Sequence, residues 1–177
     1  ALLEAGISRV VYAAKDPGQD SSGGGEFLRQ SGVEVVAGVC EAEAEEQGRI
    51  WLTANRLGRP FVTLKWASSL DGRSAASDGT SKWISGEKSR SDVRQLADAW
   101  RVCNDQAGAL HLKPRNIQEA LAELFSRGVK HLWVEGGPNV ASEFVKLGLV
   151  DEFIIYLAPM LLGGPRVALE DIGVGSM

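Results

Sequence analysis

The segment VEGGPN, residues 134–139, places a carboxylate next to a turn that could bind a phosphorylated ligand. A β-branched run ends at Glu135, two glycines follow, and Pro138 stands where a helix can begin, because its missing N–H has no partner there. The free N–H groups of a helix start favour an anion such as phosphate. A plain turn between a strand and a helix explains the pattern about equally well, and the carboxylate slightly favours a functional site.

A lysine inside an apolar strand marks a second candidate, the segment LKWASSLDGR at residues 64–73. Burial of Lys65 is costly unless its ammonium group is paired, so the side chain either faces solvent or has a function. Asp71 and Gly72 form a turn signal, and a hairpin explains them without any chemistry.

A polar loop with one large aromatic, GTSKWIS at residues 79–85, is the third candidate. Trp83 could stack on a planar ligand. It could equally anchor the start of a helix for which Ser85 is a good N-cap.

Strands alternate with helices along the chain, which predicts an α/β fold with a mainly parallel sheet. We expect strands at residues 8–14, 33–36, 61–67, 129–135 and 151–159, and helices at 26–31, 40–57, 86–101, 117–125 and 139–147. Gly58 and Pro60 interrupt helices and predict a domain boundary after residue 57. The carboxyl ends of the strands, where open α/β sheets bind ligands, would then hold the first two candidate segments.

Composition excludes several classes of protein. The 177 residues are 44% hydrophobic and 24% charged, as in globular domains, and contain no apolar run long enough to span a membrane. A net charge of −4 without an aromatic-interleaved basic patch argues against nucleic-acid binding. Two cysteines fit a reducing, cytoplasmic compartment. The sequence contains no phosphate loop, Rossmann fingerprint, nucleophile elbow or metal-ligand spacing, and His111 and His131 are isolated.

The candidate segments, taken together and in this order, carry a family resemblance. The strings VTLKWASSLDGRSAASDGTSKWIS and HLWVEGGPNVASEFVKLGLVDEFIIYLAPMLLGG resemble the reductase domain of the bifunctional riboflavin-biosynthesis deaminase/reductase. The resemblance implies a dihydrofolate-reductase-like α/β fold for residues 58–177. The leading string ALLEAGISRVVYAAKDP is similar to the end of the same family's cytidine-deaminase-like α/β domain, which implies that origin for residues 1–57.

The resemblance also implies a reaction and the residues that perform it. NADPH would reduce the ribosyl group of 5-amino-6-(5-phosphoribosylamino)uracil to a ribitylamino group, with Lys65 and Glu135 in the catalytic centre and Asp71 close by. Glu135 and Ser81 would contact the substrate. The implied cofactor contacts are Ala67, Trp83, Gly137, Pro138, Asn139, Val140 and Ala141. Homo-oligomer formation through the reductase domain is implied as well, and so is a zinc deaminase domain in the parent polypeptide, whose zinc ligands are not in this chain.

The chain departs from the family pattern in places that matter for function. Ala97 stands where the family has an arginine for the substrate phosphate, so Arg94 or Arg101 would have to replace it, and Met160 stands where lysine is common. The strand and cofactor loop that follow this helix in the family are absent. We therefore expect that about 60–90 residues of a full reductase domain are missing near residues 98–112, and that the chain is part of a longer polypeptide.

Two alternative functions stay open on the sequence alone. One is a different NADPH reductase of the dihydrofolate-reductase-like fold, acting on another pterin or pyrimidine. The other is a catalytically dead relative that serves as a binding module, which Ala97 and the missing loop favour.

Overall fold

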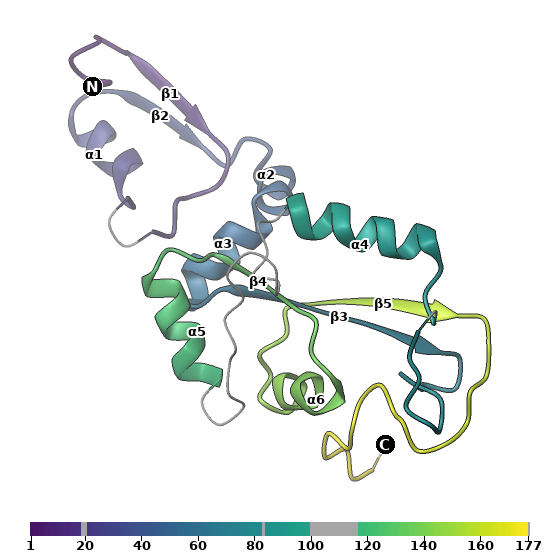
Figure 1. The fold of residues 1–177 in the computed structure, drawn as a ribbon. Coiled ribbons are helices and arrows are strands. Elements are labelled where there is room, and N and C mark those ends of the chain that lie inside the picture. Colours follow the sequence, from purple (N-terminus) through teal and green to yellow (C-terminus); the bar gives the residue numbers. More distant parts are fainter. Residues whose placement is uncertain (19–20, 83, 100–116, 177) are drawn as a thin grey trace. The chain divides into compact units, whose positions relative to one another are not determined.

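The chain consists of two compact units, residues Ala1–Arg59 and Pro60–Met177 (Figure 1). A computed structural model describes residues 1–18, 21–82, 84–99 and 117–176. Trp83 and Arg101 lie outside the described residues. So does most of the segment 98–112, near which we expect residues to be missing. Gly58 adopts a left-handed conformation with φ 65°, which glycine tolerates, and ends the last helix of the first unit.

The first unit is built on two short parallel strands connected through a helix. Its elements are β1 (Arg9–Tyr12), α1 (Gly24–Gln30), β2 (Glu34–Ala37), α2 (Glu41–Gln47) and α3 (Arg49–Leu57). β1 pairs with β2 in parallel, with Arg9 opposite Glu34. The prediction of one continuous helix over residues 40–57 is wrong. Gly48 ends α2 and precedes α3, in accordance with the low helix propensity of glycine.

The second unit contains a parallel three-stranded sheet in the order β4-β3-β5. Its elements are β3 (Phe61–Ser69), α4 (Glu87–Ala99), α5 (Ile117–Ser126), β4 (His131–Val134), α6 (Pro138–Lys146) and β5 (Glu152–Ala158). The long strand β3 pairs in parallel with both neighbours. The expected α/β class with a mainly parallel sheet is confirmed, and the carboxyl ends of all three strands lie at the same edge.

One face of this sheet carries the hydrophobic core of the second unit. Helices α5 and α6 cover this face, and α4 lies on the other side of the sheet (Figure 1). The buried core residues are Val62, Leu64, Ile117, Leu121, Leu124, Leu132, Val134, Ala141, Phe144 and Leu149. The apolar residues of α5 recur at helical spacing, so the sequence predicted this part of the core most clearly.

The opposite face of the sheet, which we call the polar face, carries polar side chains among buried aromatic ones. Thr63 is completely buried, and its hydroxyl oxygen lies 2.8 Å from His131 Nε2 of β4 and donates to Glu152 Oε2 of β5 at 2.9 Å. Buried polar groups are tolerated when such hydrogen bonds satisfy them. Because side chains alternate along a strand, Lys65 belongs to this same polar face.

A segment after β5, residues 160–171, returns across the carboxyl edge of the sheet, and we call it the strap (yellow in Figure 1). Arg73 and Val167 form an antiparallel bridge, and Ser74 N donates to Arg166 O at 2.9 Å. Farther along, Glu170 N donates to the hydroxyl of Ser142 on α6 at 2.7 Å. The strap is therefore attached to the loop after β3 and to α6.

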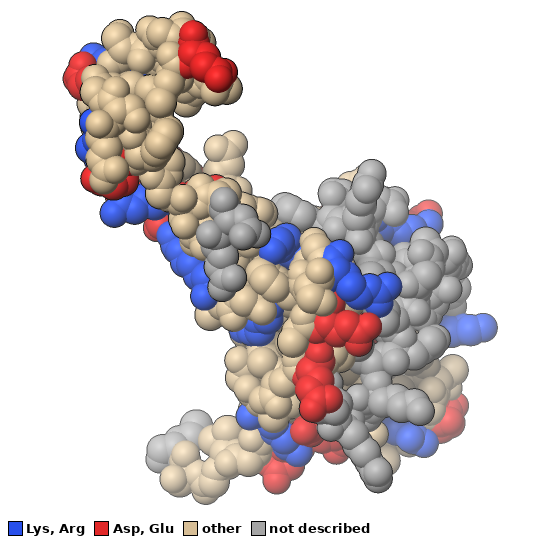
Figure 2. Space-filling view, turned by 90° about the vertical axis from the view of Figure 1, so that its left-hand side faces the viewer, with Lys and Arg blue, Asp and Glu red and all other residues tan. Residues whose placement is uncertain are grey.

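The charges on the surface and the lengths of the helices are those expected from the composition. Basic and acidic side chains occur interspersed on the face shown in Figure 2, as expected for a chain with 19 basic and 23 acidic residues. In the described parts of the chain, the helices are too short or too polar to cross a lipid bilayer.

Leu121→Ala tests the core assignment. Leu121 is 1% exposed, so we expect the truncation to lower the free energy of unfolding of the second unit by about 2–5 kcal/mol. Leu161→Ala, at a side chain that is 74% exposed, should change it by less than about 0.5 kcal/mol. Urea unfolding followed by tryptophan fluorescence measures both, and equal effects would contradict the assignment.

Candidate active site

A cleft of about 840 Å³ opens at the carboxyl ends of β3 and β4. Its wall comes from four segments: residues 65–67 within β3, residues 74–81 after β3, residues 135–139 after β4, and residues 165–170 of the strap. Open α/β sheets bind their ligands at this edge, because loops from neighbouring strands converge there.

Lys65 and Glu135 meet in the cleft because their strands are paired. Leu64 lies opposite Val134 in the register of β3 and β4, so the next residue of each strand reaches the same place. Lys65 Nζ lies 3.9 Å from Glu135 Oε2, an ion-pair distance longer than a hydrogen bond. The lysine side chain is only 16% exposed, and the glutamate, at 45%, opens to the cleft.

Trp133 orients the carboxylate of Glu135. Its indole Nε1 donates to Glu135 Oε1 at 2.8 Å, and the indole itself is buried. One carboxylate oxygen is thus held from the polar face of the sheet, and the other oxygen points towards Lys65. Trp133 was missed in the sequence because its spacing to Glu135 is also the ordinary alternation of a strand.

Tyr156 of β5 adds a third group to the polar face, and sequence reasoning did not find it. The ring centroid lies 5.7 Å from Lys65 Nζ, and the hydroxyl donates to Asp92 Oδ2 of α4 at 2.6 Å. Burial, together with the hydrogen bond to Asp92 and the charges of Asp92 and Glu135, raises the pKa of Tyr156 to about 12. The phenol therefore stays neutral, and its ring offers an electron-rich face to Lys65.

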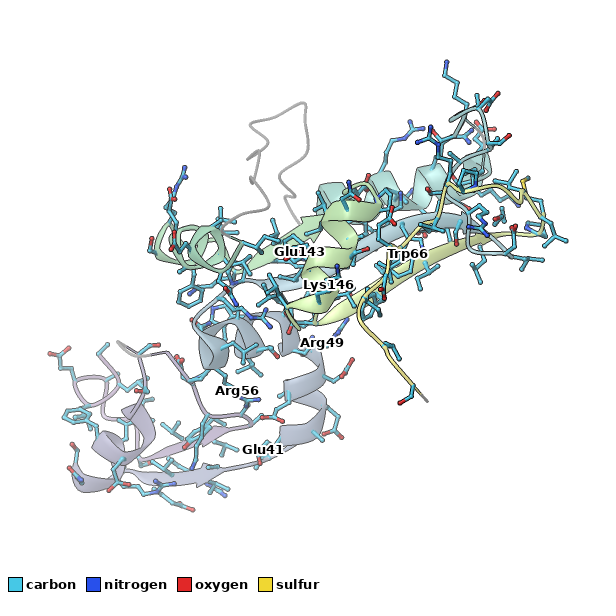
Figure 3. The ribbon with its side chains drawn as sticks, turned by 90° about the horizontal axis from the view of Figure 1, so that it is seen from below. Glu41, Arg49, Arg56, Trp66, Glu143 and Lys146 are labelled. Carbon is cyan, nitrogen blue, oxygen red and sulfur yellow. The ribbon has the colours of Figure 1, made fainter. Side chains whose placement is uncertain are left out.

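The turn after β4 is shaped for close approach to α6. A Cβ on Gly136 would lie 2.6 Å from Val140 Cβ, so any larger residue would push the turn away from the helix. Around Gly137, the N-cap, a Cβ would meet nothing within 4 Å, and no described side chain caps α6. Glu143 and Lys146 mark this helix in Figure 3. The first N–H groups of α6 are therefore not capped by a described side chain, and such uncapped groups favour an anion.

The structure brings most of the predicted site residues together. Those that line the cleft are Lys65, Ala67, Ser81, Glu135, Gly137, Pro138 and Asn139. Val140 lies behind the turn, and Ala141 is buried in the core with its N–H donated to Gly137 O. Trp83, another predicted cofactor contact, lies outside the described residues.

Asp71 does not line the cleft in the structure. Its carboxylate accepts hydrogen bonds from Ser69 Oγ at 2.5 Å, Leu162 N at 3.1 Å and Gly163 N at 2.7 Å, and Arg73 Nε lies 3.8 Å away. The hydrogen bond from Ser69, followed by those from Gly163 and Leu162, lowers the pKa of Asp71 from 3.8 to about 2. Asp71 thus joins the turn after β3 to the strap and positions the cleft wall.

The cleft also contains residues to which the sequence analysis gave no individual role. They are Trp66, Ser74, Ala75, Ser77, Gly79, Gly136, Pro165, Arg166, Val167, Ala168 and Glu170. Trp66 of β3, labelled in Figure 3, lies next to Lys65 and was visible in the same motif. Arg166 follows Gly163, Gly164 and Pro165, a turn-like composition that gave no sign of a site.

The described residues do not form a zinc site. Among them no three His, Cys, Asp or Glu side chains gather in a group that could hold a metal ion.

The second unit is an α/β domain in which a lysine of β3 and the carboxylate that follows β4 line one cleft, beside a helix start that no described side chain caps. This is where α/β domains bind small molecules. The family model for the RibD C-terminal domain matches residues 60–103 and 104–176. The chain belongs to this family.

Individual relatives extend the similarity into the first unit. The riboflavin biosynthesis protein RibD of Mycobacterium tuberculosis is 34% identical over 223 positions, which cover all of this chain and 65% of that protein, so the chain spans less than two thirds of its length. The structure of a diaminohydroxyphosphoribosylaminopyrimidine deaminase/5-amino-6-(5-phosphoribosylamino)uracil reductase from Thermotoga maritima matches with a TM-score of 0.76 and 25% identity, covering 99% of this chain and 67% of that one. The structure of Acinetobacter baumannii RibD matches with a TM-score of 0.80 and 26% identity, and the match covers 96% of this chain and 66% of that one.

Asp71→Asn tests the positioning role. Because its pKa is lower in the folded chain than its ordinary 3.8, the ionised carboxylate stabilises the fold above about pH 4, and this contribution is lost as the pH falls towards 2. We expect the variant to melt a few degrees lower at pH 7 and to lose less stability than the wild type between pH 4 and pH 2. Circular dichroism melts across this range measure both. Parallel pH profiles for the two proteins would refute the role.

Proposed function

We propose that the second unit is an NADPH-dependent reductase. It would reduce the ribosyl group of 5-amino-6-(5-phosphoribosylamino)uracil to the ribitylamino product in riboflavin biosynthesis. The observation that carries the proposal is the Lys65–Glu135 pair, held at the mouth of a cleft in a member of the RibD C-terminal domain family. The names of the relatives, which refer to riboflavin biosynthesis and to this reductase activity, support the substrate class.

The cleft fits a phosphorylated dinucleotide. The start of α6 has N–H groups that no described side chain caps, and Gly137, Ala67 and Asn139 line the cleft beside it. Bound there, NADPH would supply the hydride for C1′ of the ribosyl group. Ala67 leaves room for a planar ring beside Lys65, since its side chain ends at Cβ.

Lys65 and Glu135 suit the proton that accompanies the hydride. When C1′ gains hydride and its bond to the ring oxygen breaks, that oxygen takes a proton and becomes a hydroxyl. Lys65 Nζ is a proton donor beside Glu135 Oε2, which can orient the ammonium group. Because Trp133 holds Oε1, the carboxylate meets the sugar in one orientation.

We further propose that residues 1–57 are the end of a deaminase domain, and that the parent polypeptide is a bifunctional deaminase/reductase. The support is the similarity of the whole chain to RibD proteins and to the Thermotoga maritima deaminase/reductase. The family resemblance also supports a cytoplasmic enzyme with a small-molecule substrate that forms homo-oligomers through its reductase unit.

We also infer that a segment of the reductase is absent near residues 98–112. The division of the family match at residues 103 and 104, and an alignment of 223 positions against 177 residues, support the inference. Trypsin cuts after Arg101 and Arg115 but not between Lys113 and Pro114. If a segment is absent, a digest of the protein from its natural source should lack the peptide VCNDQAGALHLKPR, which mass spectrometry would detect. Finding this peptide would refute the inference.

Lys65→Ala and Glu135→Gln test the catalytic pair. We expect each to lower kcat by about 10²- to 10⁴-fold, the usual contribution of a positioned acid or base, and to change the Kd for NADPH by less than about threefold. NADPH oxidation with the aminouracil substrate measures the first effect, and NADPH fluorescence titration measures the second. Lys146→Ala, at an exposed lysine of α6 outside the cleft, is the matched control and should change neither.

Two outcomes of these assays would contradict the proposal. Unchanged turnover in both variants would remove Lys65 and Glu135 from the catalytic centre. A wild-type protein that binds NADPH but does not oxidise it with this substrate would not be this reductase. Turnover of another pyrimidine or a pterin would then favour a different reductase, and no turnover at all would favour an inactive binding module.

A further inference from the structure

We propose that Arg166, together with the hydroxyl groups of Ser77 and Ser81, forms a subsite that holds the phosphate of a phosphorylated sugar substrate. The inference rests on the proposed function, since it takes the cleft as the substrate site. It assigns a role to a residue of the strap, whereas sequence reasoning looked for the phosphate-binding arginine on α4 or just after it.

The backbone that carries Arg166 is fixed from several sides. Its carbonyl oxygen accepts from Ser74 N at 2.9 Å, and the hydroxyl of Ser74 donates to Val167 O at 2.9 Å. Arg73 and Val167 form the antiparallel bridge, and Asp71 binds the strap just upstream at Gly163 N. These hydrogen bonds hold the backbone of Arg166 in place at the cleft wall, and a fixed backbone favours a binding role for its side chain.

The guanidinium group and the serine hydroxyls share one wall. A Cβ on Gly79, which has φ +87°, would lie 3.9 Å from Arg166 Nη2, so the guanidinium group lies close to this turn. Gly164 of the strap lies close to Ser77 of the loop after β3, because a Cβ on Gly164 would lie 3.3 Å from Ser77 Cβ. Ser77, Ser81 and Arg166 all line the cleft. The loop after β3 thus adds hydroxyl donors to the charge of the strap.

The charge of Arg166 is available for a ligand. The described cations that line the cleft are Lys65 and Arg166. Lys65 lies beside Glu135, whereas Arg166 has no described carboxylate within 4.0 Å. Glu170 also lines the cleft, but its backbone is bonded to Ser142 of α6, four residues farther along the strap than Arg166. A planar guanidinium group with free donors matches the oxygens of a phosphate in a two-point contact.

This subsite and the start of α6 are carried by different segments of the chain. The turn into α6 follows β4, whereas Arg166 belongs to the strap, whose backbone is bonded to the loop after β3. A dinucleotide phosphate at the helix start and a sugar phosphate at Arg166 would therefore occupy different parts of the cleft wall, which Lys65 of β3 also lines. In this arrangement Lys65 meets both ligands at the place where hydride is transferred. Arg94 belongs to α4 and does not line the cleft, and Arg101 lies outside the described residues.

Ribose 5-phosphate binding tests the inference without depending on turnover. We expect Arg166→Gln in the full-length protein to weaken ribose 5-phosphate about 10- to 100-fold by calorimetry, as loss of a charged hydrogen-bond donor would, while the Kd for NADPH changes less than about twofold. Arg166→Lys should give a smaller loss, and Ser77→Ala a loss of about 2- to 10-fold. Arg94→Gln is the matched control and should bind as the wild type does. Free ribose should bind the wild type and Arg166→Gln equally.

The outcomes separate the subsite from the proposed function. If ribose 5-phosphate binds the wild type and depends on Arg166, but NADPH is not oxidised with the aminouracil substrate, the proposed function fails and the subsite stands. Equal affinity of Arg166→Gln and the wild type would overturn the subsite, whatever the turnover. So would a loss confined to Arg94→Gln, or the absence of ribose 5-phosphate binding to the wild type at millimolar concentration.

Discussion

Parallel pairing of β3 with two neighbours at once is the constraint on which the second unit depends. The register with β4 places Leu64 opposite Val134, and the register with β5 places Ala67 opposite Tyr156. A slip of one residue in either pairing would turn Lys65, Glu135 or Tyr156 to the face that α5 and α6 cover. The geometry of the cleft is therefore decided by backbone hydrogen bonds and by burial of the apolar face, before any interaction between the polar side chains themselves.

The two faces of the sheet stabilise this register in different ways. On the face towards α5 and α6, Val62 and Leu64 pack into a continuous apolar core. On the other face, Thr63 links β3 to β4 and β5 through its hydroxyl, and two residues farther along Lys65 faces Glu135. Polar groups on a buried face cost free energy unless they are paired, so this face is stable only when its partners are in register. Such pairing makes the polar face specific for one alignment of the strands.

Sequence reasoning predicted the elements well where a period was strong, as in α5, and where glycine or proline marked a boundary, as at Gly58. It also predicted which segments form the cleft, because the turn after β4 and the lysine in β3 are local signals. Tyr156 and Arg166 escaped it for a physical reason: their roles come from pairing across the sheet and from the path of the strap, and neither leaves a local pattern. The division of residues 40–57 at Gly48 was missed because the glutamate-rich run on its amino-terminal side has helical propensity throughout.

The attachments of the strap have a consequence for ligand affinity. Asp71, Ser74 and Ser142 already immobilise residues 163–170 in the folded chain, through hydrogen bonds that do not require a ligand. The conformational entropy of this wall is lost during folding, so a ligand that enters the cleft does not have to order it again. The phosphate subsite that we propose at Arg166 would accordingly be a preformed one. Loosening the attachment at Asp71 or Ser142, neither of which lines the cleft, would weaken ligand binding without removing a group of the cleft wall.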